Sequence, residues 1–426
     1  MPAVEVCKSK RYGDATDQAA KTIHVDTSGD MLLAGDYQGT LNLGGMTVTA
    51  PAPSTNVFVA RVDASWQALS LQPFAVPYGA VANDPSDPSG KGGVVLAGSY
   101  SNNPVDLGCG PLDNTTDLYV AKIDHAGKCL WTKGFSAPGA HVSLAVDPKG
   151  TIALVGDSIG PMTFNPGSVV TAGGRDIFVV KLDPASGNVI SANIYGGTQD
   201  DEANAVTFDA TGGMIVTGTF KSPLIDLGGG SVLKNTTGNP HAFVTNGSSW
   251  SVGFAGMGEQ RPTAVVVEGS VAFVAGDFTD SLGTLTSAMG NRAFFLVGLD
   301  AATGATMSGK SFDGTGAKTI RSIAASGSGL LALTGSIDGD VDFGTGKLTS
   351  SGGAVIATVE AGPMGQVKWS QAFGGASSAP LVNGAGFLGS NLFVTGAFAT
   401  TLDLGSGQIV DSLGGSDVFL AKICLP

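Results

Sequence analysis

The sequence has few charged residues, no long apolar run and no helical periodicity. Asp, Glu, Lys and Arg together make up 13% of its 426 residues, against roughly 25% in an average soluble domain. No stretch approaches about 18 uninterrupted apolar residues, so a transmembrane helix is not expected. The net charge of −13 argues against a nucleic-acid partner, because binding to phosphates requires concentrated Lys and Arg. It agrees with a soluble monomer whose copies repel one another.

Cysteine is also scarce. None of the four cysteines belongs to a C-x-x-C pair, which argues against a zinc ribbon. Their even number suggests two disulfides and an oxidising compartment. The opening residues, MPAVEVCKSK, lack the basic-then-apolar pattern of a signal sequence. Either an export signal has been removed, or the protein is cytosolic with free thiols. We favour export to the periplasm, cell surface or extracellular space.

Glycine, by contrast, is abundant and periodic. It accounts for 65 residues, about twice its usual share of roughly 7%. A small or apolar residue followed by Gly recurs seven times, and the glycines are spaced by 63, 58, 62, 58, 59 and 61 residues. These glycines are Gly35, Gly98, Gly156, Gly218, Gly276, Gly335 and Gly396. The chain therefore contains seven units of about 60 residues, the pattern of a repeat architecture.

Each unit resolves into four short β patterns, here called strands A to D. Strands A and B are joined by an Asp-x-x-Gly turn, as at 147–150, because Asp suits the first position of a type I turn and Gly the last. Alternation along strand C, as in DIFVVKLD (176–183), predicts two different faces. Strand D ends in an aromatic residue, such as Phe135 or Tyr195. In the fourth unit, Asn246-Gly247 predicts a two-residue hairpin turn between C and D.

Seven four-stranded antiparallel units are typical of an all-β, seven-bladed β-propeller, whose closed ring leaves only short edges. The rival is an open β-solenoid, but the termini favour the ring. The last unit stops after strand C, at KICLP (422–426), whereas VEVCKSKRYGD (4–14) resembles a strand D with nothing before it. We therefore expect one domain, 1–426, in which the N-terminal strand completes the last blade. The expected blades are approximately 20–75, 78–135, 140–195, 203–254, 262–312, 319–373, and 380–426 plus 3–12.

Ring closure predicts a disulfide. It places Cys7 on strand D and Cys424 on strand C of one blade, nearly opposite each other. Cys109 and Cys129 both lie in the second unit and could form a second bond, although its geometry is less constrained. A crosslink that encloses nearly the whole chain gives the largest stabilisation in loop-closure models, on the order of 4–5 kcal/mol.

The repeat resembles a known family, the bacterial β-propeller repeat abbreviated SBBP. The matching words are YGG-x-x-DD…A-V-x-x-D-x-x-G-G-M-I-V-T-G (195–218) and G-x-D-x-F-V-V-K-L-D-P-x-S-G (174–187). The resemblance covers nearly the full chain and is weakest in the fourth and sixth units. It implies a secreted or surface-associated bacterial propeller, usually without an assigned activity, and it supplies no catalytic residues.

The B–C and D–A connections emerge on one face of an antiparallel blade, and loops on a rigid scaffold commonly carry function. We therefore expect the ligand on this face. Its long B–C connections repeat an Asp-Leu-Gly phrase, which is better explained as a turn than as a site. The copies are NLGG (42–45), DLGCG (106–110), DLGGG (226–230), DFGTG (342–346) and DLGSG (403–407).

Two acidic clusters on this face are candidate binding residues. The first is Asp200, Asp201 and Glu202; the second contains Asp338 and Asp340. Together with Asp342, the second cluster alternates carboxylates in a way that suits calcium. Its spacing departs from an EF-hand, however, and solvated turn carboxylates are the simpler interpretation.

The remaining motifs favour packing over chemistry. The four histidines fall in different units and H-x-x-x-H does not occur, so a zincin is not supported. The G-x-S-x-G match at 156–160 follows a strand B pattern and no helical periodicity comes after it, so an α/β-hydrolase is not supported either. Trp131, Trp250 and Trp369 each precede an aromatic residue by four positions. Their equivalence indicates packing rather than a sugar platform. We predict no catalytic residues and, calcium aside, no cofactor.

The leading functional hypothesis is a non-enzymatic binding or scaffold module, secreted or surface-associated, for a protein or glycan ligand. Two alternatives stay open. One is a propeller lyase or hydrolase with a metal-assisted site on the loop-rich face or in the central funnel. The other is a structural component of a surface layer. A fold by itself does not decide between them.

Overall fold

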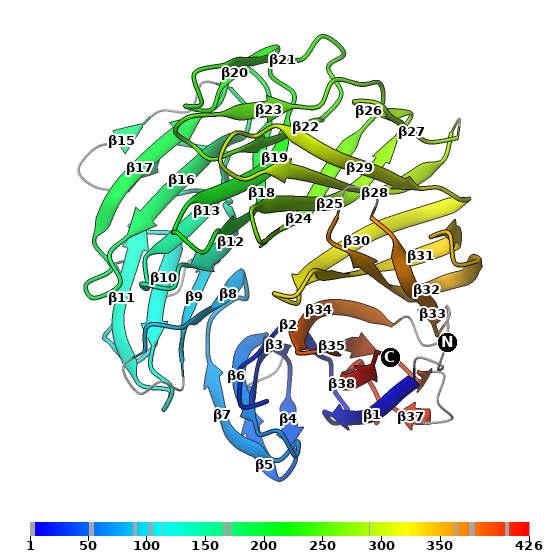
Figure 1. Cartoon of the computed structure of the whole chain (residues 1–426). Helices are drawn as coiled ribbons and strands as arrows, with labels where there is room; N and C mark the ends of the chain where they lie inside the picture. Colours follow the sequence, from blue (N-terminus) through cyan, green and yellow to red (C-terminus); the bar gives the residue numbers. More distant parts are fainter. Residues whose placement is uncertain are drawn as a thin grey trace.

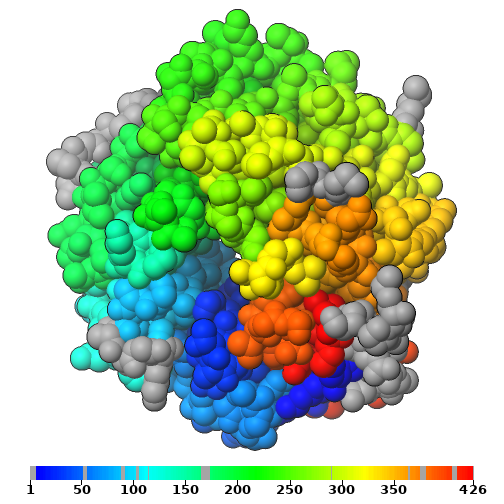
Figure 2. Space-filling model, in the orientation of Figure 1, coloured from blue at the N-terminus to red at the C-terminus, as the bar shows by residue number. Residues whose placement is uncertain are grey.

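A computed structural model of the chain describes residues 5–50, 55–87, 92–101, 105–113, 115–164, 168–169, 173–288, 290–362, 365–374, 380–404 and 409–425. Within this part, the regular elements are β-strands, and seven four-stranded antiparallel sheets stand as blades around a common axis (Figure 1). The space-filling surface is hollowed where the blades meet (Figure 2). None of the described residues belongs to a helix that could cross a membrane. The prediction of a seven-bladed β-propeller is confirmed.

Strands A to D of each blade follow one another from the axis to the rim. Blade 1 contains β2 (Gln18–Val25), β3 (Met31–Tyr37), β6 (Asn56–Val62) and β7 (Ala68–Phe74). Blade 2 contains β8 (Ala80–Asp84), β9 (Gly93–Ser99), β10 (Leu118–Ile123) and β11 (Cys129–Phe135). Blade 3 contains β12 (His141–Val146), β13 (Ile152–Ser158), β16 (Asp176–Leu182) and β17 (Val189–Tyr195). Blade 4 contains β18 (Asp201–Phe208), β19 (Met214–Phe220), β22 (His241–Thr245) and β23 (Ser251–Gly253).

The last three blades repeat this order. Blade 5 contains β24 (Gln260–Glu268), β25 (Val271–Thr279), β28 (Arg292–Asp300) and β29 (Thr306–Phe312). Blade 6 contains β30 (Gly316–Ala325), β31 (Leu330–Asp342), β32 (Lys347–Glu360) and β33 (Val367–Phe373). Blade 7 contains β34 (Leu381–Leu388), β35 (Asn391–Phe398), β38 (Asp417–Cys424) and, as its strand D, β1 (Glu5–Tyr12).

Most B–C connections form an additional hairpin at the rim (Figure 1). The hairpin strands are β4 (Thr40–Leu43) with β5 (Met46–Thr49), β14 (Met162–Thr163) with β15 (Ser168–Val169), β20 (Leu224–Asp226) with β21 (Val232–Lys234), β26 (Ser281–Leu282) with β27 (Leu285–Thr286), and β36 (Thr401–Asp403) with β37 (Ile409–Asp411). In blade 6 the hairpin is a continuation of β31 and β32. In blade 2 the described residues of this connection form no strand.

The hydrophobic core is divided into seven clusters, and each cluster lies between two neighbouring blades. Strand C shows why. Phe178, Val180 and Leu182 pack toward blade 2, whereas Ile177 and Val179 pack toward blade 4. The predicted alternation is therefore correct, but both of its faces are buried, so it separates two interfaces rather than core from solvent.

Each B–C connection adds an apolar side chain, here called a plug, to this core. The plug is the Leu or Phe of the repeated phrase or its counterpart, it is buried, and it joins the cluster shared with the preceding blade. The plugs are Leu43, Leu107, Phe164, Leu227, Leu282, Phe343 and Leu404. The sheets are arranged radially and diverge toward the rim, so the plug side chain fills the space that opens between two neighbouring blades. The Asp of the phrase closes the turn, as where Asp226 Oδ1 accepts the Gly228 N–H at 2.9 Å.

The chain ends close the ring. β1 pairs antiparallel with β38, beside which it lies in Figure 1. Cys7 and Cys424 form a disulfide between these strands with their Cα atoms 5.9 Å apart, and Arg11 Nη1 lies 2.9 Å from Asp417 Oδ2. The predicted closure and disulfide are confirmed. Cys109 and Cys129 form a second disulfide, so the described residues include no free cysteine.

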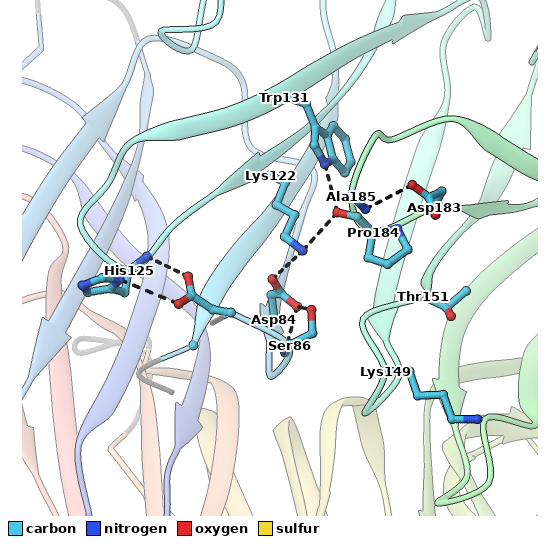
Figure 3. A network of polar contacts seen from close by, with 12 residues as sticks. Asp84, Ser86, Lys122, His125, Trp131, Lys149, Thr151, Asp183, Pro184 and Ala185 are labelled. Carbon is cyan, nitrogen blue, oxygen red and sulfur yellow. Dashed lines mark hydrogen bonds and ion pairs between the residues drawn. The ribbon is translucent and has the colours of Figure 1, made fainter. Parts of the chain in front are cut away.

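Strand D of one blade also bonds to the C–D turn of the next. Trp131 Nε1 donates to the Pro184 carbonyl at 3.1 Å (Figure 3), and Trp250 Nε1 donates to the Ala301 carbonyl at 3.2 Å. At the closure, Lys10 Nζ donates to the Trp66 carbonyl at 2.8 Å. Both donor tryptophans are buried, which agrees with their predicted packing role.

The polar contacts around Trp131 include a buried ion pair. Lys122 Nζ lies 2.9 Å from Asp84 Oδ2 and donates to the same Pro184 carbonyl at 3.1 Å (Figure 3). Nearby, the His125 N–H donates to Asp87 Oδ2 at 3.2 Å. This network joins blade 2 to blade 3 on the face that carries the A–B and C–D turns.

One local prediction is wrong. Asn246-Gly247 does not form a two-residue turn, because β22 ends at Thr245 and β23 begins at Ser251. The Asn246 side chain explains the wider turn: its Oδ1 accepts the backbone N–H groups of Ser248, Ser249 and Trp250.

The two disulfides should differ in their contribution to stability. Replacing Cys7 and Cys424 by Ser should lower the free energy of unfolding by about 4–5 kcal/mol, because this bond spans 417 residues of sequence. Replacing Cys109 and Cys129, which are 20 residues apart, should cost about 3 kcal/mol. Urea denaturation of both double variants without reductant measures the two losses. An equal or larger loss for the second variant would contradict the loop-length argument.

The indole hydrogen bond can be tested separately. Trp131→Phe should lower the free energy of unfolding by about 1 kcal/mol more than Trp369→Phe does, because it also loses the bond to Pro184. Trp369 occupies the equivalent position, and the described residues offer its indole N–H no acceptor. Urea denaturation of both variants gives the difference, and identical losses would show that the bond contributes nothing.

Candidate functional site

An open pocket lies over blade 2, on the face that carries the D–A connections. We call it the blade-2 pocket. Its volume is about 400 Å³, within the approximate 300–1,000 Å³ range of small-molecule sites. Strand ends β9 and β10 form its floor, and the connections from blade 1 and to blade 3 form its sides. The lining residues are Ala75, Pro77, Ser99, Tyr100, Ser101, Val105, Asp117 and Gly139.

Asp117 lines this pocket, whereas its equivalent in blade 3 is buried. In blade 3 the equivalent Asp176 is buried against Gly196, where any Cβ would overlap its Oδ1 atom. Blade 2 has Ser136 in place of that glycine, and Asp117 is partly exposed. Asp117 Oδ1 accepts the Ala137 N–H at 2.5 Å. Within the described residues its Oδ2 has no hydrogen-bond donor, so it can accept one from a ligand.

Hydrogen bonds hold the pocket walls in place. Tyr100 Oη contacts Thr116 Oγ1 and lies 3.3 Å from the Asp113 carbonyl. The hydroxyl of Tyr119 donates to the Pro77 carbonyl at 2.6 Å, and Ser99 Oγ donates to the Ala140 carbonyl at 2.5 Å. Burial raises the pKa of Tyr100, so its hydroxyl stays protonated at neutral pH. The pocket is therefore formed before any ligand arrives.

A second open pocket, the rim groove, lies beside it between β11 and β17. It has a volume of about 440 Å³ and is lined by Thr115, Thr116, Lys133, Gly134, Phe135, Ser136, Thr163, Gly187, Asn188 and Val189. Lys133 Nζ donates to Asn188 Oδ1 at 3.0 Å, and the described residues bring no carboxylate to this ammonium. Thr116 borders the groove while contacting Tyr100 of the blade-2 pocket, so the two pockets share a wall.

The first predicted acidic cluster lies at the start of strand A in blade 4, away from these pockets. Asp201 is buried and accepts hydrogen bonds from the Gly197 N–H, the Ser222 N–H and the Ser222 hydroxyl. Burial raises the pKa of Asp201 despite these bonds. Asp200 forms an exposed ion pair with Lys221 at 3.0 Å, and Glu202 is partly exposed. Asp201 therefore caps a connection, and a binding role for the cluster stays a prediction.

The second cluster lies on the rim hairpin of blade 6. Asp340 Oδ2 is 2.7 Å from both Lys347 Nζ and Thr315 Oγ1, and the Lys347 ammonium holds the pKa of Asp340 well below its usual range. Asp338 and Asp342 are exposed. No three His, Cys, Asp or Glu side chains among the described residues are arranged to hold a metal ion. Calcium at Asp338, Asp340 and Asp342 stays a prediction.

The sequence analysis missed two ion pairs, each between a buried Asp near the end of strand B and an Arg at the start of strand C. Asp157 pairs with Arg175 in blade 3, and Asp277 pairs with Arg292 at 2.5 Å in blade 5. In both blades the Asp follows the repeat glycine, and the Arg lies three residues before a strand C Phe. The two spacings recur together in blades 3 and 5, and this recurrence could have predicted the ion pairs from the sequence. Burial raises the pKa of Asp277 to about 6, although Arg292 opposes the shift.

Strand A, the innermost strand of each blade, carries further polar residues. A β-bulge in strand A occurs at Lys21, Asn204, Thr263, Arg321 and Asn383. Desolvation lowers the pKa of Arg321, although its side chain stays exposed. This combination is expected for a group in a hollow that remains open to solvent.

The buried Asp277 predicts a specific dependence of stability on pH. Its folded-state pKa of about 6 lies above the ordinary value, so the folded protein retains a proton that the unfolded chain has lost. The free energy of unfolding should therefore fall as pH rises from about 4 to 6, and this contribution should be absent in Asp277→Asn. Urea denaturation across that range tests it, with the exposed Asp226→Asn as control. Parallel pH profiles for the wild type and Asp277→Asn would contradict it.

Comparison with known proteins gives limited information. No family model matches the chain. The regulatory protein FlaEY of Caulobacter vibrioides is 28% identical over 172 residues, which cover 38% of this chain. The match spans only 16% of the length of that relative.

Several solved structures match nearly the whole chain at low identity and low TM-score. A member of the DUF4221 family from Bacteroides vulgatus is 8% identical, with a TM-score of 0.40, and the match covers 99% of this chain and 97% of that one. Cobalt-substituted Synechocystis ACO is 9% identical, with a TM-score of 0.42, and the match covers 97% of this chain and 93% of that one. The quinohemoprotein alcohol dehydrogenase of Comamonas testosteroni is 10% identical, with a TM-score of 0.41, and the match covers 98% of this chain and 76% of that one. Similarities this weak carry no argument about the chemistry of this chain.

Proposed function

We propose that this protein is a non-enzymatic binding module, secreted or surface-associated in a bacterium, that engages a protein or glycan ligand through the face bearing the D–A connections. The observation that carries the proposal is the blade-2 pocket. Its volume suits a ligand, its walls are held by hydrogen bonds, and Asp117 offers an uncommitted acceptor oxygen. A preformed pocket lowers the entropic cost of binding.

Three features support an extracellular setting. Both cysteine pairs form disulfides, which persist mainly in oxidising compartments. The resemblance to the SBBP repeat implies a secreted or surface-associated propeller as well. A closed ring with its ends crosslinked also suits a scaffold outside the cell, where unfolded chains have no cytosolic chaperones to refold them.

The proposal predicts that binding depends on one face only. Ser101 and Thr27 are both exposed, and they lie in loops on opposite faces of the ring. Ser101→Trp should block capture of the ligand because the indole fills the mouth of the blade-2 pocket. Thr27→Trp should leave capture unchanged. Glycan-array binding and pull-down of partners from the native cell surface, run on both variants and the wild type, measure this.

Thermal unfolding of each variant controls for damage to the fold. Equal capture by both variants would place the binding surface elsewhere and overturn the assignment of this face. Absence of any captured glycan or protein by the folded wild type would overturn the binding function itself.

A further inference from the structure

We infer that the blade-2 pocket and the rim groove form one continuous site for an acidic oligosaccharide, with successive sugar units in the two pockets and a carboxylate-bearing unit at Lys133. This inference rests on the proposed function and narrows its ligand to a glycan.

The first support is the adjacency of the two pockets. Thr116 lines the rim groove, and its hydroxyl contacts Tyr100, which lines the blade-2 pocket. The next residue along the chain, Asp117, belongs to the blade-2 pocket. This contact places the two cavities, of about 400 and 440 Å³, next to each other. A chain molecule can pass over the Tyr100–Thr116 contact with one unit on each side, whereas a compact ligand fills only one pocket.

The second support is the chemistry of the lining. Sugars present hydroxyls that both donate and accept, and they present apolar ring faces. Asp117 Oδ2 can accept a hydrogen bond from a sugar hydroxyl, and such bonds to charged groups are the stronger ones. Pro77 and Val105 supply apolar surface for a ring face. The other polar lining is mostly hydroxyl, from Ser101, Thr115, Thr116, Ser136 and Thr163.

The third support is the charge of Lys133. Its ammonium has the neutral Asn188 amide as a partner, and the described residues bring no carboxylate to it, although acidic residues outnumber basic ones by 35 to 22 in the chain. A ligand carboxylate would complete this site. Lys310 occupies the same strand position in blade 5 and donates to the Gly365 carbonyl, but the cavity beside it is only about 20 Å³. Of these two lysines, Lys133 is the one that borders a cavity large enough for a ligand.

The test compares two trisaccharides of equal length, tri-galacturonate and neutral maltotriose, by isothermal titration calorimetry on the intact protein. The wild type should bind tri-galacturonate at least tenfold more tightly than maltotriose. Lys133→Gln should weaken tri-galacturonate about tenfold and leave maltotriose unchanged. Lys310→Gln, the matched control, should change neither affinity.

Two further variants locate the site. Asp117→Asn should weaken both sugars about tenfold, because it removes a charged acceptor from the shared pocket. This variant should fold, since Asn56 occupies the equivalent buried position in blade 1. Ser101→Trp should abolish binding of both sugars by filling the pocket. Thermal unfolding of every variant checks that the ring is intact.

Distinct outcomes overturn the inference. Absence of binding to either trisaccharide, equal affinity for both, or equal effects of the Lys133 and Lys310 variants would each refute it. If the face-specific capture experiment succeeds with a protein or another glycan while neither trisaccharide binds, the proposed function survives and only the acidic saccharide is wrong. If the capture experiment also detects no ligand, the proposed function and the acidic saccharide are both wrong.

Discussion

The structure depends on one repeated interaction, the apolar contact between neighbouring blades. No blade has a core of its own, because both faces of each sheet are buried only by the sheets beside it. A missing contact anywhere in the ring would expose two apolar faces, and burial of apolar surface is the main stabilising term in folding.

The weakest point is therefore the place where the chain is interrupted, between β1 and β38. The disulfide between Cys7 and Cys424 and the Arg11–Asp417 ion pair both lie there. Tyr12 and Val6 of β1 enter different clusters, so this one strand completes two interfaces at once.

The two edges of each blade show how the ring avoids pairing with other chains. Strand D carries a β-bulge near its start in blades 1, 2, 3, 5, 6 and 7, and bulges on edge strands disrupt further pairing. In blades 1, 2, 3 and 5 the bulged residue is an exposed apolar side chain, such as Leu69 or Leu130. In blade 7 it is Cys7, so the same irregularity directs the sulfur toward Cys424.

On the inner edge, bulged asparagines join neighbouring blades. Asn204 Nδ2 donates to the Pro262 carbonyl at 2.7 Å, and Asn383 Nδ2 donates to the Ala20 carbonyl at 2.8 Å.

The architecture could be predicted from the sequence because its signals are local and repeated. The Asp-x-x-Gly turns, the alternation of strand C and the unpaired N-terminal strand each need only a short window of sequence. The rim hairpins show the limit of this method. The repeat identified Asp-Leu-Gly as a turn, but the burial of Leu227 follows from the divergence of two blades, which no single unit encodes. The burial of Asp201 has the same origin: its donors come from a different segment, around Ser222, which its acidic neighbours in the sequence do not reveal. The blade-2 pocket likewise depends on segments from three blades.

The comparison of blades indicates where function resides in a repeat protein. A residue that recurs in most units satisfies the packing demand that every blade shares, so recurrence itself explains it. A residue that departs from the repeat is released from that demand. Blade 2 concentrates such departures: Ser136 replaces the glycine that buries Asp176 in blade 3, and the described part of its B–C connection lacks the rim hairpin. That connection is anchored instead by the Cys109–Cys129 disulfide and by the buried Leu107. Covalent anchoring holds a loop without the hydrogen bonds of a hairpin, which leaves the polar groups beside it available to a ligand. The ring supplies rigidity through its likeness from blade to blade, and the pocket lies where blade 2 differs from blade 3.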